Sequence, residues 1–140
     1  MAKRVHFLGQ RDDVAALMRA VDFVVHPSTS PEPFARTLIE AMLAGHAPIA
    51  SECGGVPELI ESERTGYLFP PGDVRALRSL LERLTAAPDT MSQVGRGARE
   101  HARRHFGKSA FVSAVTAHLQ AAVAPHEGER VHALARTLAT

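Results

Sequence analysis

Glu32 and Glu40 are the residues whose type and spacing best suggest chemistry, because they lie eight positions apart around the start of a predicted helix. Pro33 opens that helix, and a strand-like apolar run over residues 22–26 precedes it. A strand, a short polar loop and a helix N-terminus present free backbone N–H groups and the positive end of the helix dipole to an anion. Carboxylates beside such a site suit the hydroxyls of a sugar and a ribose. The segment therefore predicts a nucleotide-sugar site.

The same residues also have a purely structural interpretation. On a helical projection of residues 34–44 the apolar side chains share one broad arc, and Arg36, Thr37 and Glu40 occupy the polar side. Arg36 and Glu40 are then an i,i+4 ion pair on a solvated face, which stabilises a helix by roughly 0.2–0.5 kcal/mol. Glu32 is then a loop acid favoured by the helix dipole. Periodicity alone does not choose between the two interpretations.

The elements that must position these carboxylates are short apolar runs that alternate with helical patterns. Strands are predicted at residues 5–8, 23–25, 47–51 and 66–69, and helices at 13–21 (capped by Asp12), 33–44, 57–61, 73–86, 90–105 (interrupted by Gly95 and Gly97) and 109–123. Strands separated in this way need crossover connections, which predicts an α/β fold with a Rossmann-like parallel sheet and helices on both faces. Ligands bind such sheets at the carboxyl ends of the strands, where residues 28–34 and 52–55 are expected.

Length and composition set the class of protein. The chain has 140 residues, of which 45% are apolar and 22% charged, with a formal net charge of +1. These values are typical of one soluble domain and give no reason to expect nucleic acid as a partner. The single cysteine, Cys53, excludes an internal disulfide and fits a reducing compartment. There is no apolar run that could span a membrane and no signal peptide pattern, so a cytoplasmic protein is expected.

The order of several motifs closely resembles that of the group 1 glycosyltransferases. The motifs are D-F-V-V-H-P-S, E-P-F-A-R-T-L-I-E-A-M-L-A-G, P-I-A-S, G-G-V-P-E-L-I and G-Y-L-F-P-P-G-D, and the match runs from Val5 to about Phe111. Members of this family are retaining enzymes of the GT-B architecture, with two Rossmann-like domains and the sugar-nucleotide donor on the C-terminal one. The resemblance covers only the later part of that domain, so an incomplete sheet is expected.

The resemblance implies a partial nucleotide-sugar-binding domain at residues 1–124 and a tail or short helix at residues 125–140. Two earlier strand–helix units, which clamp the donor phosphates, and the acceptor-binding N-terminal domain are expected in cis or on a partner chain. In the strand order 3-2-1-4-5-6 of doubly wound sheets, residues 5–8 correspond to the third strand and residues 23–26 to the fourth. Two central strands would then lie between them.

The resemblance also implies a role for each site residue. The family's E-x7-E motif falls on Glu32, expected to contact the transferred sugar as the catalytic residue, and on Glu40, expected to bind the ribose. Backbone N–H groups of residues 34–36 are expected to meet the pyrophosphate. Family members usually have glycine in place of Ala35, whose methyl group can crowd the donor. The expected donor-binding set is Glu32, Phe34, Ala35, Arg36, Thr37, Glu40, Gly54 and Gly55, with Gly9 and Gln10 near the base. Neither a metal nor a cofactor is expected.

Three other features have two interpretations each. Gly54 and Gly55 either let a ligand approach the backbone or make a strand-to-helix turn. Glu58 matches a family glutamate, although a helix-start or loop-bracing role is preferred. Cys53 has no activating base nearby in sequence, so an incidental or buried thiol is preferred to a nucleophile.

The histidines and a basic cluster are predicted to be solvated. No pair of the eight histidines has a convincing metal-ligand spacing. The basic cluster has a second interpretation, a peripheral patch for anionic lipid headgroups at the inner membrane face. Its members are Arg96, Arg99, Arg103, Arg104 and Lys108.

Two functions of different classes follow. The first is the donor-binding part of a glycosyltransferase that moves a hexosyl group from a nucleoside-diphosphate sugar to an acceptor hydroxyl with retention, in glycan biosynthesis. Because such catalysis needs both substrates positioned in a closed cleft, this chain alone is expected to be inactive. The second is a non-catalytic nucleotide-sugar-binding or interaction module descended from such an enzyme.

Overall fold

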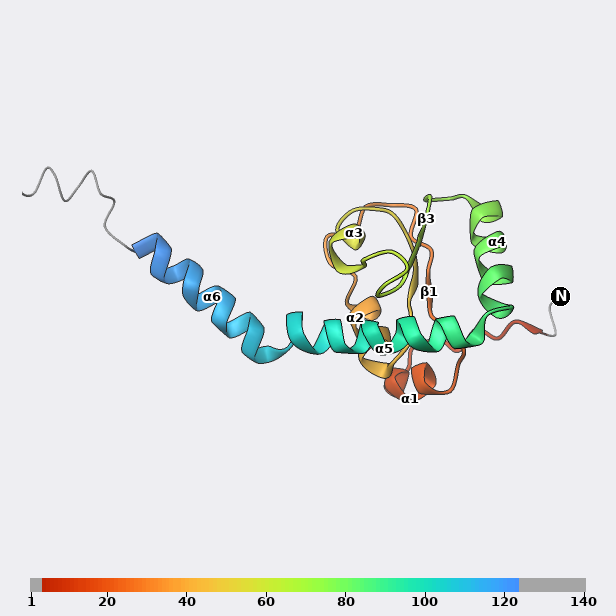
Figure 1. Cartoon of the computed structure of the whole chain (residues 1–140), viewed down its shortest axis with the longest axis horizontal. Coiled ribbons are helices and arrows are strands. Elements are labelled where there is room, and N and C mark those ends of the chain that lie inside the picture. Colours follow the sequence, from red (N-terminus) through yellow and green to blue (C-terminus); the bar gives the residue numbers. More distant parts are fainter. Residues whose placement is uncertain (1–3, 124–140) are drawn as a thin grey trace, which may run out of the picture. The chain divides into compact units, whose positions relative to one another are not determined.

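The computed structural model describes residues 4–123, in which strands and helices alternate as far as the fourth helix and two further helices follow (Figure 1). The strands are β1 (Val25–His26), β2 (Ile49–Ser51) and β3 (Tyr67–Phe69), and the helices are α1 (Val14–Arg19), α2 (Arg36–Ala44), α3 (Val56–Leu59), α4 (Val74–Thr85), α5 (Pro88–His105) and α6 (Lys108–Val123). The chain divides into two compact units, Met1–Phe106 and Gly107–Thr140, and each is described by itself. The predicted tail at 125–140 lies outside the described residues.

The three strands form one parallel sheet in the order β1-β2-β3. Val25 lies opposite Ile49, which in turn lies opposite Tyr67. Helix α2 connects β1 to β2, and α3 connects β2 to β3. The sheet confirms the predicted Rossmann-like α/β class and three of the four predicted strands.

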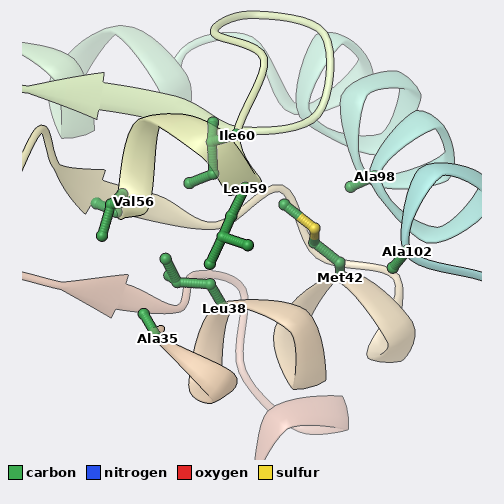
Figure 2. Packing of buried hydrophobic residues seen from close by; sticks show 9 residues of the cluster. Ala35, Leu38, Met42, Val56, Leu59, Ile60, Ala98 and Ala102 are labelled. Atoms are coloured by element: carbon green, nitrogen blue, oxygen red, sulfur yellow. The ribbon is translucent and has the colours of Figure 1, made fainter. Parts of the chain in front are cut away.

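Helices cover both faces of the sheet, because successive residues of a strand point to opposite faces. On one face, Ala50 packs in an apolar cluster with side chains from α2, α3 and α5 (Figure 2), namely Ala35, Leu38, Met42, Val56, Leu59, Ile60, Ala98 and Ala102. On the other face, Ile49 packs with Tyr67, Phe69, Leu80, Leu84 and Val94. Helices α3 and α4 accordingly lie on opposite sides of the strands (Figure 1).

Local signals determine several helix ends. The Asp73 carboxylate caps α4 by accepting a hydrogen bond from the Ala76 N–H at 2.9 Å, as its position predicts. Gly45 ends α2 with a φ of 98°, the left-handed conformation that glycine adopts most easily. Helix α1 starts after Asp13, not Asp12, and the Asp13 carboxylate pairs with Arg11 instead of capping the helix.

Helix α2 begins at Arg36, three residues later than Pro33 predicts. The backbone of Ala35 has a ψ of 80°, which is not helical. The reason lies in the preceding loop, whose Glu32 carbonyl accepts a hydrogen bond from the Gly55 N–H. Residues 33–35 therefore belong to a loop held against the segment after β2.

Helix α5 is continuous from Pro88 to His105, so the predicted interruption at Gly95 and Gly97 is wrong. Both glycines allow close packing. A Cβ atom on Gly95 would lie 2.3 Å from the Gly45 carbonyl oxygen, and one on Gly97 would lie 2.9 Å from that of Arg64. The missing side chains let α5 approach the end of α2 and the loop before β3, which offsets the low helix propensity of glycine.

The predicted strand at residues 5–8 is also wrong, because this segment forms no strand and the Phe7 side chain is 97% exposed. An isolated strand gains no backbone hydrogen bonds, and the third strand of a doubly wound sheet is not adjacent to the fourth. Within residues 4–123, β1 pairs with β2 alone, so its other edge is open and Val25 remains exposed.

None of the described helices combines the length and the apolar composition that a membrane span requires.

The open edge of β1 predicts self-association of the 140-residue chain. Unpaired strand edges template pairing with other chains, and a charged side chain at the edge opposes it. We expect sedimentation velocity to show concentration-dependent association of the parent chain, and Val25→Lys to shift it towards monomer. Val74→Lys, at an exposed valine that begins α4, is the matched control and should leave association unchanged. A monodisperse parent that melts cooperatively above about 60 °C, in the upper part of the mesophile range, would contradict this prediction.

Candidate functional site

The loop that carries Glu32 packs directly on the two glycines that follow β2. The Gly55 N–H donates a hydrogen bond to the Glu32 carbonyl at 2.9 Å. A Cβ atom on Gly54 would lie 2.5 Å from the Glu32 backbone nitrogen, and one on Gly55 would lie 2.4 Å from the Pro33 carbonyl oxygen. The close approach that requires the two glycines is therefore made by another part of the same chain, in a turn that also leads into α3.

Ser51, the last residue of β2, ties the same loop to the sheet. Its side chain is fully buried, and its hydroxyl donates to the Ser28 carbonyl at 2.5 Å. Ser51 is not among the site residues that the sequence predicts. A hydroxyl at the carboxyl end of an otherwise apolar strand is the signal that could have identified it, because buried polar groups need partners.

Three histidines are partly buried, so the prediction that all the histidines are solvated is wrong for them. His26 lies 2.7 Å from Glu32, and the His46 ring contacts the Met18 carbonyl. His101 packs against Phe106 and lies 3.4 Å from Glu61. Burial, together with the neighbouring His105, lowers the pKa of His101 below its ordinary value. All three rings have specific partners, and the His26 ring lies at the candidate site.

The start of α2 presents its backbone beside Glu32. The Arg36 N–H already donates to the Phe34 carbonyl at 3.0 Å, so one of the three expected phosphate donors has a partner within the chain. Ala35 is 1% exposed and its methyl group packs in the apolar cluster of Figure 2. The methyl group therefore points into the core. Phe34 is half-exposed, and its ring meets that of Phe106 edge to face.

Glu40 and Arg36 form the ion pair of the structural interpretation. The Arg36 guanidinium lies 3.7 Å from the Glu40 carboxylate, and both side chains are exposed. Such a pair contributes little in water. Thr37 is exposed on the same helix. The Glu40 carboxylate consequently remains accessible to a second partner.

The other predicted site residues lie in varied surroundings. Gly9 and Gln10 are exposed in the irregular segment before α1. Glu58 is exposed in the first turn of α3, where a carboxylate suits the helix dipole, and Cys53 is partly buried. Within the basic cluster, Arg104 pairs with Glu100 at 2.9 Å.

A cavity of about 460 Å³ lies beside the amino ends of the strands, at the opposite end of the strands from Glu32. It is lined by residues that precede β1 and β2, including Asp22, Phe23 and His46, and by the junction of α4 and α5. Ligands of open parallel sheets bind at the carboxyl ends of the strands. The Glu32 loop is therefore the better candidate for the functional site. Among residues 4–123, no three His, Cys, Asp or Glu side chains cluster in a way that could hold a metal ion.

The chain belongs to the group 1 glycosyltransferases, because the family model for "Glycosyl transferases group 1" matches residues 1–101. The fold agrees: the chain superimposes on Alr3699/HepE from Anabaena in complex with UDP with a TM-score of 0.82 at 33% identity, over 86% of this chain and 33% of that one. A complex of the same protein with UDP-glucose gives a TM-score of 0.79 at 34% identity, over 84% and 32% of the two chains.

Curated relatives carry related transferase names. The N-acetyl-alpha-D-glucosaminyl L-malate synthase of Bacillus anthracis is 34% identical over 110 residues, which are 79% of this chain and 29% of the relative. The sulfoquinovosyl transferase SQD2 of Arabidopsis thaliana is 30% identical over 128 residues, which are 89% of this chain and 25% of the relative. The chain thus spans between a quarter and a third of these two proteins.

The packing of the two glycines on the Glu32 loop predicts that a side chain at Gly54 destabilises the fold more than one at a glycine without such contacts. Gly54→Ala and Gly72→Ala both place alanine at a positive φ, 60° and 74°, but only Gly54 has a backbone atom within 4 Å of the new Cβ. We expect Gly54→Ala to lower the free energy of unfolding by about 1–3 kcal/mol more than Gly72→Ala, because overpacking adds to the shared backbone strain. Denaturant unfolding at low protein concentration measures the difference. Equal losses in the two variants would show that the loop is not packed on Gly54.

Proposed function

We propose that this chain is the donor-binding part of a retaining glycosyltransferase that transfers a hexosyl group from a nucleoside-diphosphate sugar to an acceptor hydroxyl. The observation that carries the proposal is the place of Glu32, in a loop between the carboxyl end of β1 and the N-terminus of α2. Support comes from Alr3699/HepE, which has the same fold and was solved with UDP and with UDP-glucose.

In the proposed site, three groups of the chain contact three parts of the donor: the diphosphate, the ribose and the sugar. The α2 N-terminus and the N–H group of the half-exposed Phe34 face the diphosphate, for which oriented backbone donors are suited. The exposed Glu40 carboxylate accepts hydrogen bonds from the ribose hydroxyls, and Glu32 accepts them from the sugar. Charge-assisted hydrogen bonds of this kind are about twice as strong as neutral ones.

Substitution of Glu40 separates most clearly the binding of the nucleotide from the binding of the sugar. We expect Glu40→Ala to weaken UDP binding by roughly 1.5–3 kcal/mol, the worth of a charged hydrogen bond, because the ribose is common to all such donors. Glu82→Ala is the matched control: Glu82 is also exposed and also pairs with an arginine at i−4, Arg78, on α4. Titration calorimetry of the 140-residue chain with UDP measures both variants. Unchanged UDP affinity in Glu40→Ala would contradict the ribose assignment.

Glu32 should act on the sugar and not on the nucleotide. We expect Glu32→Ala to bind UDP as the parent does but to lose affinity for UDP-glucose, or discrimination among UDP-, GDP- and ADP-hexoses, because one acceptor for sugar hydroxyls is gone. The same calorimetric panel tests this. Equal losses for UDP and UDP-glucose would place Glu32 at the nucleotide or in the fold.

The second candidate is a non-catalytic interaction module descended from such an enzyme. It is favoured because two groups of the proposed site already interact within the chain instead of being free for a donor. The Arg36 N–H donates to the Phe34 carbonyl, and Glu40 pairs with Arg36. A parent chain that binds none of the nucleotides in the panel, even with a donor-domain complement added in trans, would favour the module over the enzyme.

A further inference from the structure

His26 is the last residue of β1, and its side chain turns towards the loop that follows the strand. Its Nε2 atom lies 2.7 Å from Oε2 of Glu32, six residues later. The His26 side chain is 18% exposed and that of Glu32 is 36% exposed. Because a carboxylate only accepts hydrogen bonds, the hydrogen in this contact must sit on His26 Nε2.

The backbone of Glu32 is fixed independently of His26. Gly55 donates to the Glu32 carbonyl at 2.9 Å, Gly54 leaves no room for a side chain beside the Glu32 nitrogen, and the buried Ser51 hydroxyl holds the Ser28 carbonyl at the start of the loop. These contacts do not restrain the torsions of the Glu32 side chain. The hydrogen bond from His26 fixes those torsions.

The consequence for the carboxylate is an asymmetry between its two oxygens. Oε2 is occupied by His26, so Oε1 is the oxygen available to a ligand. An acceptor side chain that is already ordered loses less conformational entropy when a ligand hydroxyl binds than a freely rotating side chain does. The second carboxylate, Glu40, has an exposed arginine as its neighbour and no comparable restraint.

We propose that His26 is a positioning residue that orients the Glu32 carboxylate towards the sugar of the bound donor. This inference rests on the proposed function, since it assigns the sugar to Glu32. It adds a residue whose ring need not contact the donor. Its contribution is selective: the sugar-binding oxygen depends on His26, whereas the helix N-terminus and Glu40, which serve the nucleotide, do not.

The test compares two substitutions at His26. His26→Leu removes the hydrogen bond and keeps an apolar side chain of similar reach, while His26→Gln places an amide N–H near the position of the imidazole Nε2. In His26→Leu we expect the Kd for UDP-glucose to rise about tenfold, on the order of one charged hydrogen bond, with the Kd for UDP unchanged. His26→Gln should recover most of the loss. His118→Leu, at an exposed histidine of α6, should bind both ligands as the parent does.

Each outcome of the calorimetric titrations decides a different claim. Equal losses for UDP and UDP-glucose in His26→Leu, or no loss for UDP-glucose, would overturn the positioning role while leaving the proposed function intact. A failure of the parent to bind any nucleotide of the panel, even with the donor-domain complement added in trans, would overturn the proposed function itself, and with it the role of His26 towards a sugar.

The His26–Glu32 contact can also be measured without ligand. In ¹H–¹⁵N spectra of the imidazole groups, we expect Glu32→Gln to shift the His26 resonances, whereas Glu82→Gln should leave them in place. Unshifted His26 resonances in Glu32→Gln would overturn the inference whatever the titrations show.

Discussion

The candidate site depends on one steric constraint, the contact between the Gly54–Gly55 turn and the backbone of Glu32 and Pro33. Atoms of the two segments approach so closely that a Cβ atom on either glycine would lie within 2.5 Å of the opposing backbone. This contact joins the loop after β1 to the loop after β2 at the carboxyl edge of the sheet. It fixes where α2 begins and where the backbone of Glu32 lies, within reach of His26. The position of Glu40, the second carboxylate, then follows from the geometry of helix α2 alone.

The same principle operates in the rest of the first unit. Gly95 and Gly97 let α5 pack against the end of α2 and the loop before β3, as described above. Because α5 contributes Ala98 and Ala102 to one cluster and Val94 to the other, it helps to complete the core on both faces of a sheet of only three strands. Backbone-to-backbone approach thus positions both the site and the helix that supports it.

The sequence predicts the features that depend on local pattern. Strand β3 is an apolar run between Gly66 and Pro70, and β2 follows Pro48 and is apolar up to Ser51. The Asp73 cap and the Gly45 terminus are determined by adjacent residues. Residues 5–8 show the same strand pattern, but a strand also needs a neighbour, which local pattern does not reveal. The backbone contacts that Gly54, Gly55 and Gly95 allow could not be predicted because their partners lie on other elements. The sequence likewise predicts a solvated His26, because no local pattern shows that its ring meets Glu32, six residues later.

The central claim is that a nucleotide sugar binds at the carboxyl edge of the sheet, at the Glu32 loop and the start of α2. Backbone amide chemical-shift mapping of the 140-residue chain with UDP-glucose tests this most directly. We predict that the largest shifts fall on residues 34–37, on Glu32 and on the Gly54–Gly55 turn, with further shifts at Glu40. Shifts confined to the cavity at the opposite end of the strands, around Asp22, His46 and Ser92, or saturating ligand without any shift, would contradict the account.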